Sequence, residues 1–369
     1  MSAVNLELTQ HLVDILRTQE AGDIDLKLSP PVQEALIDHA QDHGVGPLCY
    51  ERICGSALIK SFDTELLARL HIHTVAETVL DTHRQRCLRE VLTALGKAGI
   101  NSLVFKGSAL AQTHYSQTYL RPRDDNDILV AHHHLTALNT ILSRLGFQRT
   151  VTNQQDLILR QYLYWRRDSN GCLHNLDIHW ALNNRQGLGD KLNLTELRIR
   201  ASPLHGLGEF ALAPHPVDAV LIACLHLAAH HAGEIRLIWL YDLHLLIEAM
   251  STEELKRLAD EIQRLDLVQA CSLGLGLAAF YFSQSGSKFE ILGAEPLDPE
   301  TVRAPRRIEA WQADLSALPS MSLRIRYLSQ HLIPNSRYML RRAGKTSSLW
   351  LPWLYVLRAG RGVQHLLRP

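Results

Sequence analysis

The stretch KGSALAQTHYSQTYLRPRDDNDILV, residues 106–130, places acidic residues directly before a run with the composition of a buried strand. Asp124, Asp125 and Asp127 lie between two arginines and the apolar residues 128–130. A buried carboxylate costs several kcal/mol unless a cation or hydrogen bonds compensate it. Acidic residues at the point where a sheet forms therefore predict a site that binds cations.

The spacing of these acids indicates which cation they bind. Side chains two apart on a strand share a face, so Asp125 and Asp127 are expected to project together while Asn126 points the other way. Two neighbouring carboxylates repel each other unless a cation lies between them. Oxygen ligands favour Mg²⁺ or Mn²⁺ over Zn²⁺. The alternative is a solvated strand end or a helix-capping pair that binds no metal.

A hairpin downstream supplies a third carboxylate. Two β-rich runs flank Asn170 and Gly171, and Asn-Gly is a strong hairpin signal because both central positions of the favoured turn need positive φ. In HNLDIHW, residues 174–180, the alternation places Asp177 on one face together with Asn175 and His179. If this strand neighbours the first one, three carboxylates converge, which suits two metal ions and a proton acceptor. Otherwise Asp177 pairs with Arg166 or Arg167 across the hairpin.

Phosphate-binding groups are predicted at the start of the quoted stretch. Gly107 lets a phosphate approach the backbone, the amides of a helix start attract anions, and Ser108 adds a hydroxyl. Lys106 either contacts phosphate or only extends its ammonium group to solvent. Arg121 and Arg123 either bind phosphates bidentately or neutralise Asp124.

The rest of the chain indicates a mainly helical α+β protein with a small mixed β-sheet. The 369 residues, 46% of them hydrophobic, are enough for more than one domain. Apolar residues recur at helical spacing before Gly99 and again from about His215 onward, and β-rich runs lie between them. We expect an N-terminal helical region at 1–98, a core with the mixed sheet at 99–202, and a C-terminal helical domain at 203–369.

Charge is distributed unevenly although the formal net charge is zero. Residues 1–98 carry 14 acidic and nine basic side chains, whereas residues 321–369 carry nine basic side chains and no acid. This basic tail either binds phosphates, nucleic acid or an anionic surface, or pairs with the acidic N-terminal region.

Cysteine usage and hydropathy indicate a cytoplasmic protein without a membrane span. The six cysteines form no paired CxxC clusters, so we expect reduced, buried thiols and neither a disulfide framework nor a zinc ribbon. No apolar segment reaches the roughly 20 residues that a membrane helix needs, and no secretory leader is evident.

The ordered motifs resemble those of the DNA polymerase beta-like nucleotidyltransferase superfamily, and more narrowly the bacterial family of uncharacterised nucleotidyltransferases. The similar residues are Lys-Gly-Ser-Ala-Leu at 106–110, Arg121, Asp-Asn-Asp-Ile-Leu-Val at 125–130 and Asp-Ile-His-Trp at 177–180. RLIWLYD, residues 236–242, is similar to an Arg-x-x-Trp-x-x-Asp helix of this family. Asn126 departs from the family's usual apolar residue, and we expect it to affect packing more than catalysis.

The resemblance implies an enzyme that moves a nucleoside monophosphate from a nucleoside triphosphate, such as ATP, to an acceptor hydroxyl and releases pyrophosphate. Asp125 and Asp127 would hold two Mg²⁺ or Mn²⁺ ions, and Asp177 would complete the site and assist the nucleophile. Lys106, Gly107, Ser108 and Arg121 would bind the nucleotide. The expected acceptor is a small molecule or a peptide, with nucleic acid as a further option. Two alternatives are transfer of a sugar or sugar phosphate on the same core and a non-catalytic binding module.

Overall fold

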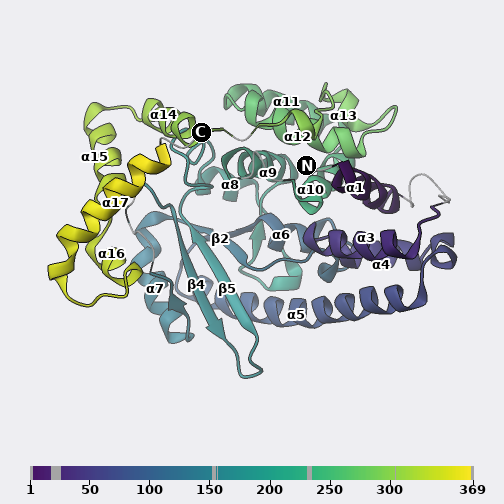
Figure 1. The fold of residues 1–369 in the computed structure, drawn as a ribbon, viewed down its shortest axis with the longest axis horizontal. Coiled ribbons are helices and arrows are strands. Elements are labelled where there is room, and N and C mark those ends of the chain that lie inside the picture. The colour runs from purple at the N-terminus through teal and green to yellow at the C-terminus, as the bar shows by residue number, and fades with distance from the viewer. Residues whose placement is uncertain are drawn as a thin grey trace.

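The computed structural model describes residues 3–17, 26–151, 155, 157–230, 235–303 and 305–366 (Figure 1). The predicted class, a mainly helical α+β protein with a small mixed sheet, is confirmed. The strands are β1 (Ser102–Phe105), β2 (Asn126–Val130), β3 (Gln148–Arg149), β4 (Gln161–Arg167), β5 (Leu173–His179), β6 (Ser202–Pro203) and β7 (Leu212–Ala213). The helices of the first half are α1 (Ala3–Leu16), α3 (Pro30–Asp42), α4 (Gly46–Cys54), α5 (Thr64–Lys97), α6 (Lys106–Thr113), α7 (Leu135–Arg144) and α8 (Leu194–Arg200). Those of the second half are α9 (Pro216–His230), α10 (Leu237–Ala249), α11 (Thr252–Arg264), α12 (Val268–Phe282), α13 (Lys288–Ile291), α14 (Arg307–Ala317), α15 (Met321–Leu332), α16 (Ser336–Arg342) and α17 (Leu351–Leu366).

The main sheet has five strands in the order β1-β2-β5-β4-β3. β2 and β5 pair in parallel, and the other three neighbouring pairs are antiparallel. The predicted hairpin is present as β4 and β5, and Gly171 in its turn has a φ of 80°. β2 therefore lies between its antiparallel neighbour β1 and the hairpin strand β5, and residues far apart in sequence meet at the centre of the sheet.

The two faces of the sheet belong to two hydrophobic clusters. Val104, Ile128 and Ile178 pack with apolar residues of α5 and α7 in one cluster. Leu103 and Leu129, on the opposite face, belong to the larger cluster formed with the N-terminal and C-terminal helices. Because both faces are covered, β1 and β2 are buried along their whole length, which explains their apolar runs at 103–105 and 128–130.

The N-terminal helices and α9 to α12 share one apolar core rather than packing as two separate bodies. The amide of Ile238, in α10, donates to the carbonyl of His43 at 3.2 Å, and the Arg52 guanidinium donates to the Tyr241 hydroxyl at 3.2 Å. The boundaries expected at 98/99 and 202/203 stay predictions.

Local signals account for the helix ends that matter here. The Asp63 carboxylate caps α5 by accepting from the amides of Glu65 and Leu66, and the chain leaves α5 through Gly99, whose φ is 71°. A capping box of Ser251 and Glu254 begins α11. The helical stretch that follows consists of two helices, α11 and α12.

The basic tail forms α15, α16 and α17 at the opposite end of the molecule from α1, α3 and α4 (Figure 1). Arg324 donates to the carbonyl of Leu318 and Arg358 to that of His331, while Arg342 donates to the Tyr338 hydroxyl. The partners of these three arginines therefore lie in the tail or just before it, and these hydrogen bonds do not pair the arginines with the acidic N-terminal region.

The cysteines and the hydropathy of the helices can be compared with what the sequence predicted. Cys49, Cys87, Cys224 and Cys271 are buried free thiols, but Cys54 is exposed and Cys172 is half-buried, so the expectation of uniform burial was wrong. Within the described ranges, no helix has the length and apolarity that crossing a membrane requires.

Candidate active site

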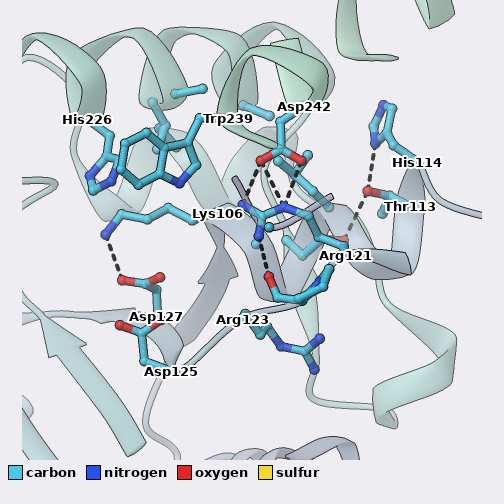
Figure 2. A pocket seen from close by; sticks show the side chains of 18 of the residues that line it. Lys106, Thr113, His114, Arg121, Arg123, Asp125, Asp127, His226, Trp239 and Asp242 are labelled. Carbon is cyan, nitrogen blue, oxygen red and sulfur yellow. Dashed lines mark hydrogen bonds and ion pairs between the residues drawn. The ribbon is translucent and has the colours of Figure 1, made fainter. Parts of the chain in front are cut away.

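The pairing of β2 with β5 brings two of the predicted carboxylates together. Asp127 lies directly opposite Asp177 in the parallel register. Ligand atoms of Asp127, Asp177 and His179 all lie within 4.8 Å of one another. Asp125 precedes β2, and Figure 2 shows its carboxylate beside that of Asp127. The three acids thus converge on one face of the sheet, as expected if the two strands were neighbours.

Asp127 is the one carboxylate of the three with both an ion-pair partner and a hydrogen bond to an imidazole. The Lys106 ammonium lies 2.7 Å from its Oδ1 (Figure 2). Nε2 of His179 lies 2.9 Å from the same oxygen. Burial alone would raise the pKa of Asp127, but Lys106 and the His179 hydrogen bond together hold that pKa well below its usual range. Asp127 is therefore a fixed anion at neutral pH.

Asp125 and Asp177 lack such compensation, so ionising them is costly. Burial, followed by repulsion from Asp127, raises the pKa of Asp125 to about 6. Burial, followed by repulsion from Asp125 and Asp127, raises the pKa of Asp177 to about 8. Asp177 makes a hydrogen bond with Gln161, whose Nε2 donates to Oδ2 at 3.1 Å. The group as a whole has a deficit of positive charge that bound cations would remove.

The predicted alternative partners of Asp177 bond elsewhere. Arg166 donates to the carboxylate of Glu90 and to the carbonyl of Leu145. Arg167 donates to the carbonyl of Gly171 within the hairpin turn. The hairpin therefore does not neutralise Asp177 through these arginines.

Lys106 stands at the junction of β1 and α6 in a left-handed backbone conformation, with a φ of 54°. Only a few per cent of non-glycine residues have positive φ, and such strain concentrates at functional sites. The turn directs the Lys106 side chain toward Asp127, and α6 begins at this same residue. Lys106 is therefore placed in the site rather than extended into solvent.

Gly107 and Ser108 have structural roles that sequence reasoning did not foresee. A Cβ atom at Gly107 would lie 3.2 Å from the Arg121 guanidinium, so glycine allows that close approach. Ser108 is buried, and its hydroxyl donates to Oδ1 of Asn126 at 2.9 Å. Contact between the Ser108 hydroxyl and a phosphate would require this bond to break. Asn126 points away from the carboxylates, as predicted, and links β2 to α6.

Arg121 and Arg123 are each buried against a distant acid, and neither neutralises Asp124. The Arg121 guanidinium donates to both oxygens of Asp242, with distances of 2.7 to 3.0 Å (Figure 2). Arg123 donates to Asp81 of α5 at 2.7 Å. Because these ion pairs connect the loop before β2 to α10 and to α5, they fix the approach of the chain to the carboxylates.

A cavity of about 530 Å³ opens beside Lys106, Asp125 and Asp127, within the size range of small-molecule sites. The helices α5, α6, α9 and α10 contribute to its walls, and four cationic side chains line it: Lys106, Arg121, Arg123 and Arg236. His226 and Trp239 also line it, and their rings meet edge to face with centroids 5.8 Å apart (Figure 2).

A second cavity, of about 730 Å³, lies along the outward face of the β4–β5 hairpin. Asp124 and Asp125 border both cavities, whereas Asp177 lines only the second. Trp165, which is 37% exposed, and Leu163 supply apolar surface, and Gln161 and Asn175 supply amides. The carboxylates therefore stand where two differently lined cavities meet.

The three residues of the Arg-x-x-Trp-x-x-Asp motif lie together beside the first cavity. Trp239 and Asp242 lie three residues apart on one side of α10, Arg236 directly precedes this helix, and all three line the first cavity. From the sequence, this stretch was noted only for its similarity to a family helix, and Arg236 and Asp81 had no assigned role. The periodic spacing was the available signal for Arg236, while nothing local marks Asp81 as the partner of Arg123.

Taken together, a small mixed sheet with acids on adjacent strands, next to a Lys-Gly-Ser helix start, defines a class of proteins with a nucleotidyltransferase-like core. The profile of the family described as "Uncharacterised nucleotidyltransferase" matches residues 29–283, well over half of the chain, and the chain belongs to this family. Membership supports a transferase that moves nucleotidyl groups.

Two other comparisons add little to this assignment. The solved structure of the antibiotic-resistance factor ANT(2'')-Ia is similar over 51% of this chain and 96% of its own, with 13% sequence identity and a TM-score of 0.37. A likeness this low carries no argument about the present chain. No curated protein matches the chain significantly.

Proposed function

We propose that this protein transfers a nucleoside monophosphate from a nucleoside triphosphate to a hydroxyl group of an acceptor, with release of pyrophosphate. The observation that carries the proposal is the deficit of positive charge at Asp125 and Asp177, at the border of a cavity lined by four cationic side chains. Carboxylates held together without enough cations are suited to divalent metal ions, and the metal ions in turn bind phosphates.

The side chains present fit two Mg²⁺ or Mn²⁺ ions. Asp125 and Asp127 would hold the ions from the end of β2, and Asp177 would complete the site from β5. All three ligands are carboxylates, and hard oxygen ligands favour these two metals. Bound ions would neutralise the triphosphate and align the attacking and leaving oxygens. Lys106 and His179 would keep Asp127 ionised and oriented with either metal.

The donor nucleotide is assigned to the first cavity because its cations suit a polyanion. The amides at the start of α6, including those of Gly107 and Ser108, would bind phosphate oxygens together with Lys106. Arg121 would contribute its positive field while staying bonded to Asp242. The nucleobase would lie toward Trp239 and His226, whose rings offer a stacking surface.

The acceptor is assigned to the second cavity because Asp177 lines it and the cationic residues of the first cavity do not. A hydroxyl that enters along the hairpin would meet Asp177, which would accept its proton as the oxygen attacks the α-phosphate. Gln161 would hold the Asp177 carboxylate in position through its hydrogen bond. The mixture of amides, carboxylates and Trp165 suits a small acceptor with several polar groups.

A thermal-shift panel tests the proposal. The protein is melted with each of four nucleoside triphosphates and with a uridine diphosphate sugar, in the presence and absence of Mg²⁺. A ligand at 100 times its dissociation constant stabilises the native state by about 2.7 kcal/mol. We expect Mg²⁺-dependent stabilisation by at least one triphosphate, its loss in Asp127→Asn, and its retention in Asp266→Asn, whose side chain is 95% exposed and outside both cavities.

Other results would redirect the assignment. Stronger Mg²⁺-dependent stabilisation by the sugar nucleotide would favour sugar transfer on the same core. No stabilisation by any of these ligands would favour a non-catalytic binding module. If a triphosphate binds, the decisive activity measurement is pyrophosphate release in the presence of a pool of hydroxyl compounds.

A further inference from the structure

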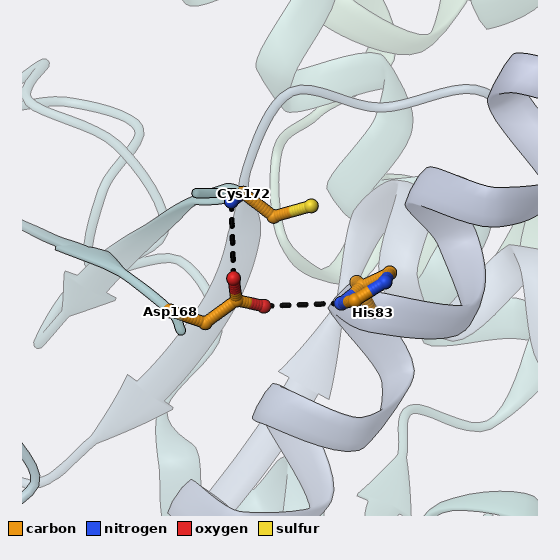
Figure 3. A group of neighbouring side chains, drawn as sticks. All are labelled: His83, Asp168 and Cys172. Atoms are coloured by element: carbon orange, nitrogen blue, oxygen red, sulfur yellow. Dashed lines mark hydrogen bonds and ion pairs between the residues drawn. The ribbon is translucent and has the colours of Figure 1, made fainter. Parts of the chain in front are cut away.

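A second group of metal-ligand side chains lies at the tip of the β4–β5 hairpin, on the face of the sheet opposite Asp177. His83 of α5 meets Asp168 and Cys172 of the hairpin turn (Figure 3), and His174 of β5 contacts the same carboxylate. We call these four residues the hairpin-tip cluster. Because His174 and Asp177 point to opposite faces of β5, this cluster is separate from the candidate active site.

The Asp168 carboxylate organises the hairpin-tip cluster. Its Oδ1 accepts from the amides of Asn170 and Cys172 at 2.9 and 3.0 Å, which fixes the turn. Its Oδ2 lies 3.0 Å from Nδ1 of His83 and 3.0 Å from Nε2 of His174. One oxygen therefore shapes the hairpin, while the other faces two imidazole nitrogens.

The ligand atoms are close enough for one ion. A nitrogen of His83, an oxygen of Asp168 and the sulfur of Cys172 all lie within 4.8 Å of one another. Zinc–ligand bonds of about 2.0–2.3 Å place the ligand atoms of a tetrahedral site about 3.3–3.8 Å apart. Side-chain rotations that bring the atoms together by about 1 Å would therefore form the site, with no change in the backbone of the turn.

We propose that His83, Asp168 and Cys172 bind a Zn²⁺ ion. Thiolate and imidazole ligands favour zinc over Mg²⁺, which prefers oxygen ligands alone. The choice of ligands thus separates this site from the three carboxylates on the other face. Neither the family description nor the proposed transfer reaction requires a metal here, and the proposal does not rest on that reaction.

His174 acts as a positioning residue for this ion. Its side chain is 2% exposed, and its Nε2 holds the Asp168 carboxylate on the side that faces His83. Outer partners of this kind orient metal ligands, and their loss typically lowers metal affinity by about 10- to 100-fold. The fourth zinc position would be filled by water or by His174 after rotation of its ring.

The ion would join the hairpin to α5. Asp81, two residues before His83 on the same helix, already holds Arg123 and with it the segment that enters β2. A zinc link from His83 to the hairpin would fix β5, the strand that carries Asp177, to the same helix. α5 would then hold both carboxylate strands, and metal binding would make the hairpin resistant to local opening.

Metal analysis of the full-length protein tests the site. After incubation with Zn²⁺ and dialysis, elemental analysis should find one zinc per chain in the wild type. His83→Gln and Cys172→Ser should lose it, whereas the matched control Cys54→Ser, which changes an exposed cysteine elsewhere, should keep it. Co²⁺ loading should give thiolate-to-metal charge-transfer absorption that disappears in Cys172→Ser and in His83→Gln and persists in Cys54→Ser. His174→Ala should bind Zn²⁺ about 10- to 100-fold more weakly and still saturate.

Two results would overturn the proposal. One is absence of bound zinc in the reconstituted wild type, which would leave the hairpin-tip cluster as a hydrogen-bonded turn. The other is a zinc content that Cys172→Ser and His83→Gln, each shown by circular dichroism to be folded, do not change. Repeating the assay in Asp127→Asn distinguishes the two sites, because zinc lost there would belong to the carboxylates of the candidate active site.

Discussion

Replacing Asp177 by asparagine should stabilise the metal-free protein at high pH. Asp177 has a pKa raised to about 8, from 3.8, by burial and by the charges of Asp125 and Asp127. The folded state therefore binds a proton more tightly than the unfolded state does. As pH rises from about 4 through 8, the wild type loses stability because Asp177 must ionise against its neighbours. Asparagine keeps the shape and an acceptor for Gln161 but never ionises.

The size of the effect follows from the shift in pKa. Each pKa unit corresponds to about 1.4 kcal/mol, so the full displacement of Asp177 would be worth about 6 kcal/mol at pH 9. The side chain is only half-buried, and water screens part of the repulsion, so we expect a gain of about 2 kcal/mol. Near pH 4, where the carboxyl is protonated in the folded protein and the repulsion is absent, the gain should vanish.

Urea unfolding at pH 4, 7 and 9 with a chelator present measures this dependence. The gain in unfolding free energy of Asp177→Asn should grow with pH. Asp124→Asn removes the same charge from an exposed position in the neighbouring segment and should change stability by less than about 0.5 kcal/mol at each pH. Added Mg²⁺ should stabilise the wild type at pH 8 and narrow its difference from Asp177→Asn.

A pH-independent difference would refute this reasoning, as would a variant that is less stable than the wild type at pH 9. Either result would mean that Asp177 is not in electrostatic contact with the other two acids. The assignment of three carboxylates to one metal site would then fail as well.

The other stability predictions concern the support of the site by Arg121. Asp242→Ala should lower the unfolding free energy by about 3–5 kcal/mol in urea titrations, because it leaves the buried Arg121 guanidinium unpaired. As a control, Asp190→Ala removes the exposed carboxylate of an ion pair and should lower this free energy by less than about 1 kcal/mol. Equal losses of unfolding free energy in the two variants would contradict the buried pairing of Arg121 with Asp242. Gly107→Ala should cost about 1–3 kcal/mol, because its Cβ would lie 3.2 Å from that guanidinium. An unchanged melting temperature for Gly107→Ala would show that Arg121 can move without cost.

Several features of the site could be predicted from the sequence because they depend on near neighbours. Strand periodicity places Asp125 and Asp127 on one face and Asn126 on the other. Asn170 and Gly171 mark the hairpin. The apolar run at 128–130 forms a strand as expected, since a short apolar run beside turn residues has few alternatives.

Contacts between residues far apart in the chain could not be predicted from the sequence. Strand alternation does not say that β2 pairs with β5 in parallel, and that register is what sets Asp127 opposite Asp177. The Arg121–Asp242 ion pair and the meeting of His83 with Asp168 likewise have no local signal. Such contacts form only when helices and strands pack, because the burial that selects one partner belongs to the whole fold.

The sequence by itself determined the chemical groups, their order and the faces on which they lie. Only the tertiary structure decided their charge states, because Asp127 lies beside Lys106 and His179 while Asp177, an identical side chain, lies beside two other acids. The energy of a carboxylate depends on the charges and the solvent around it, and distant segments of the chain supply both.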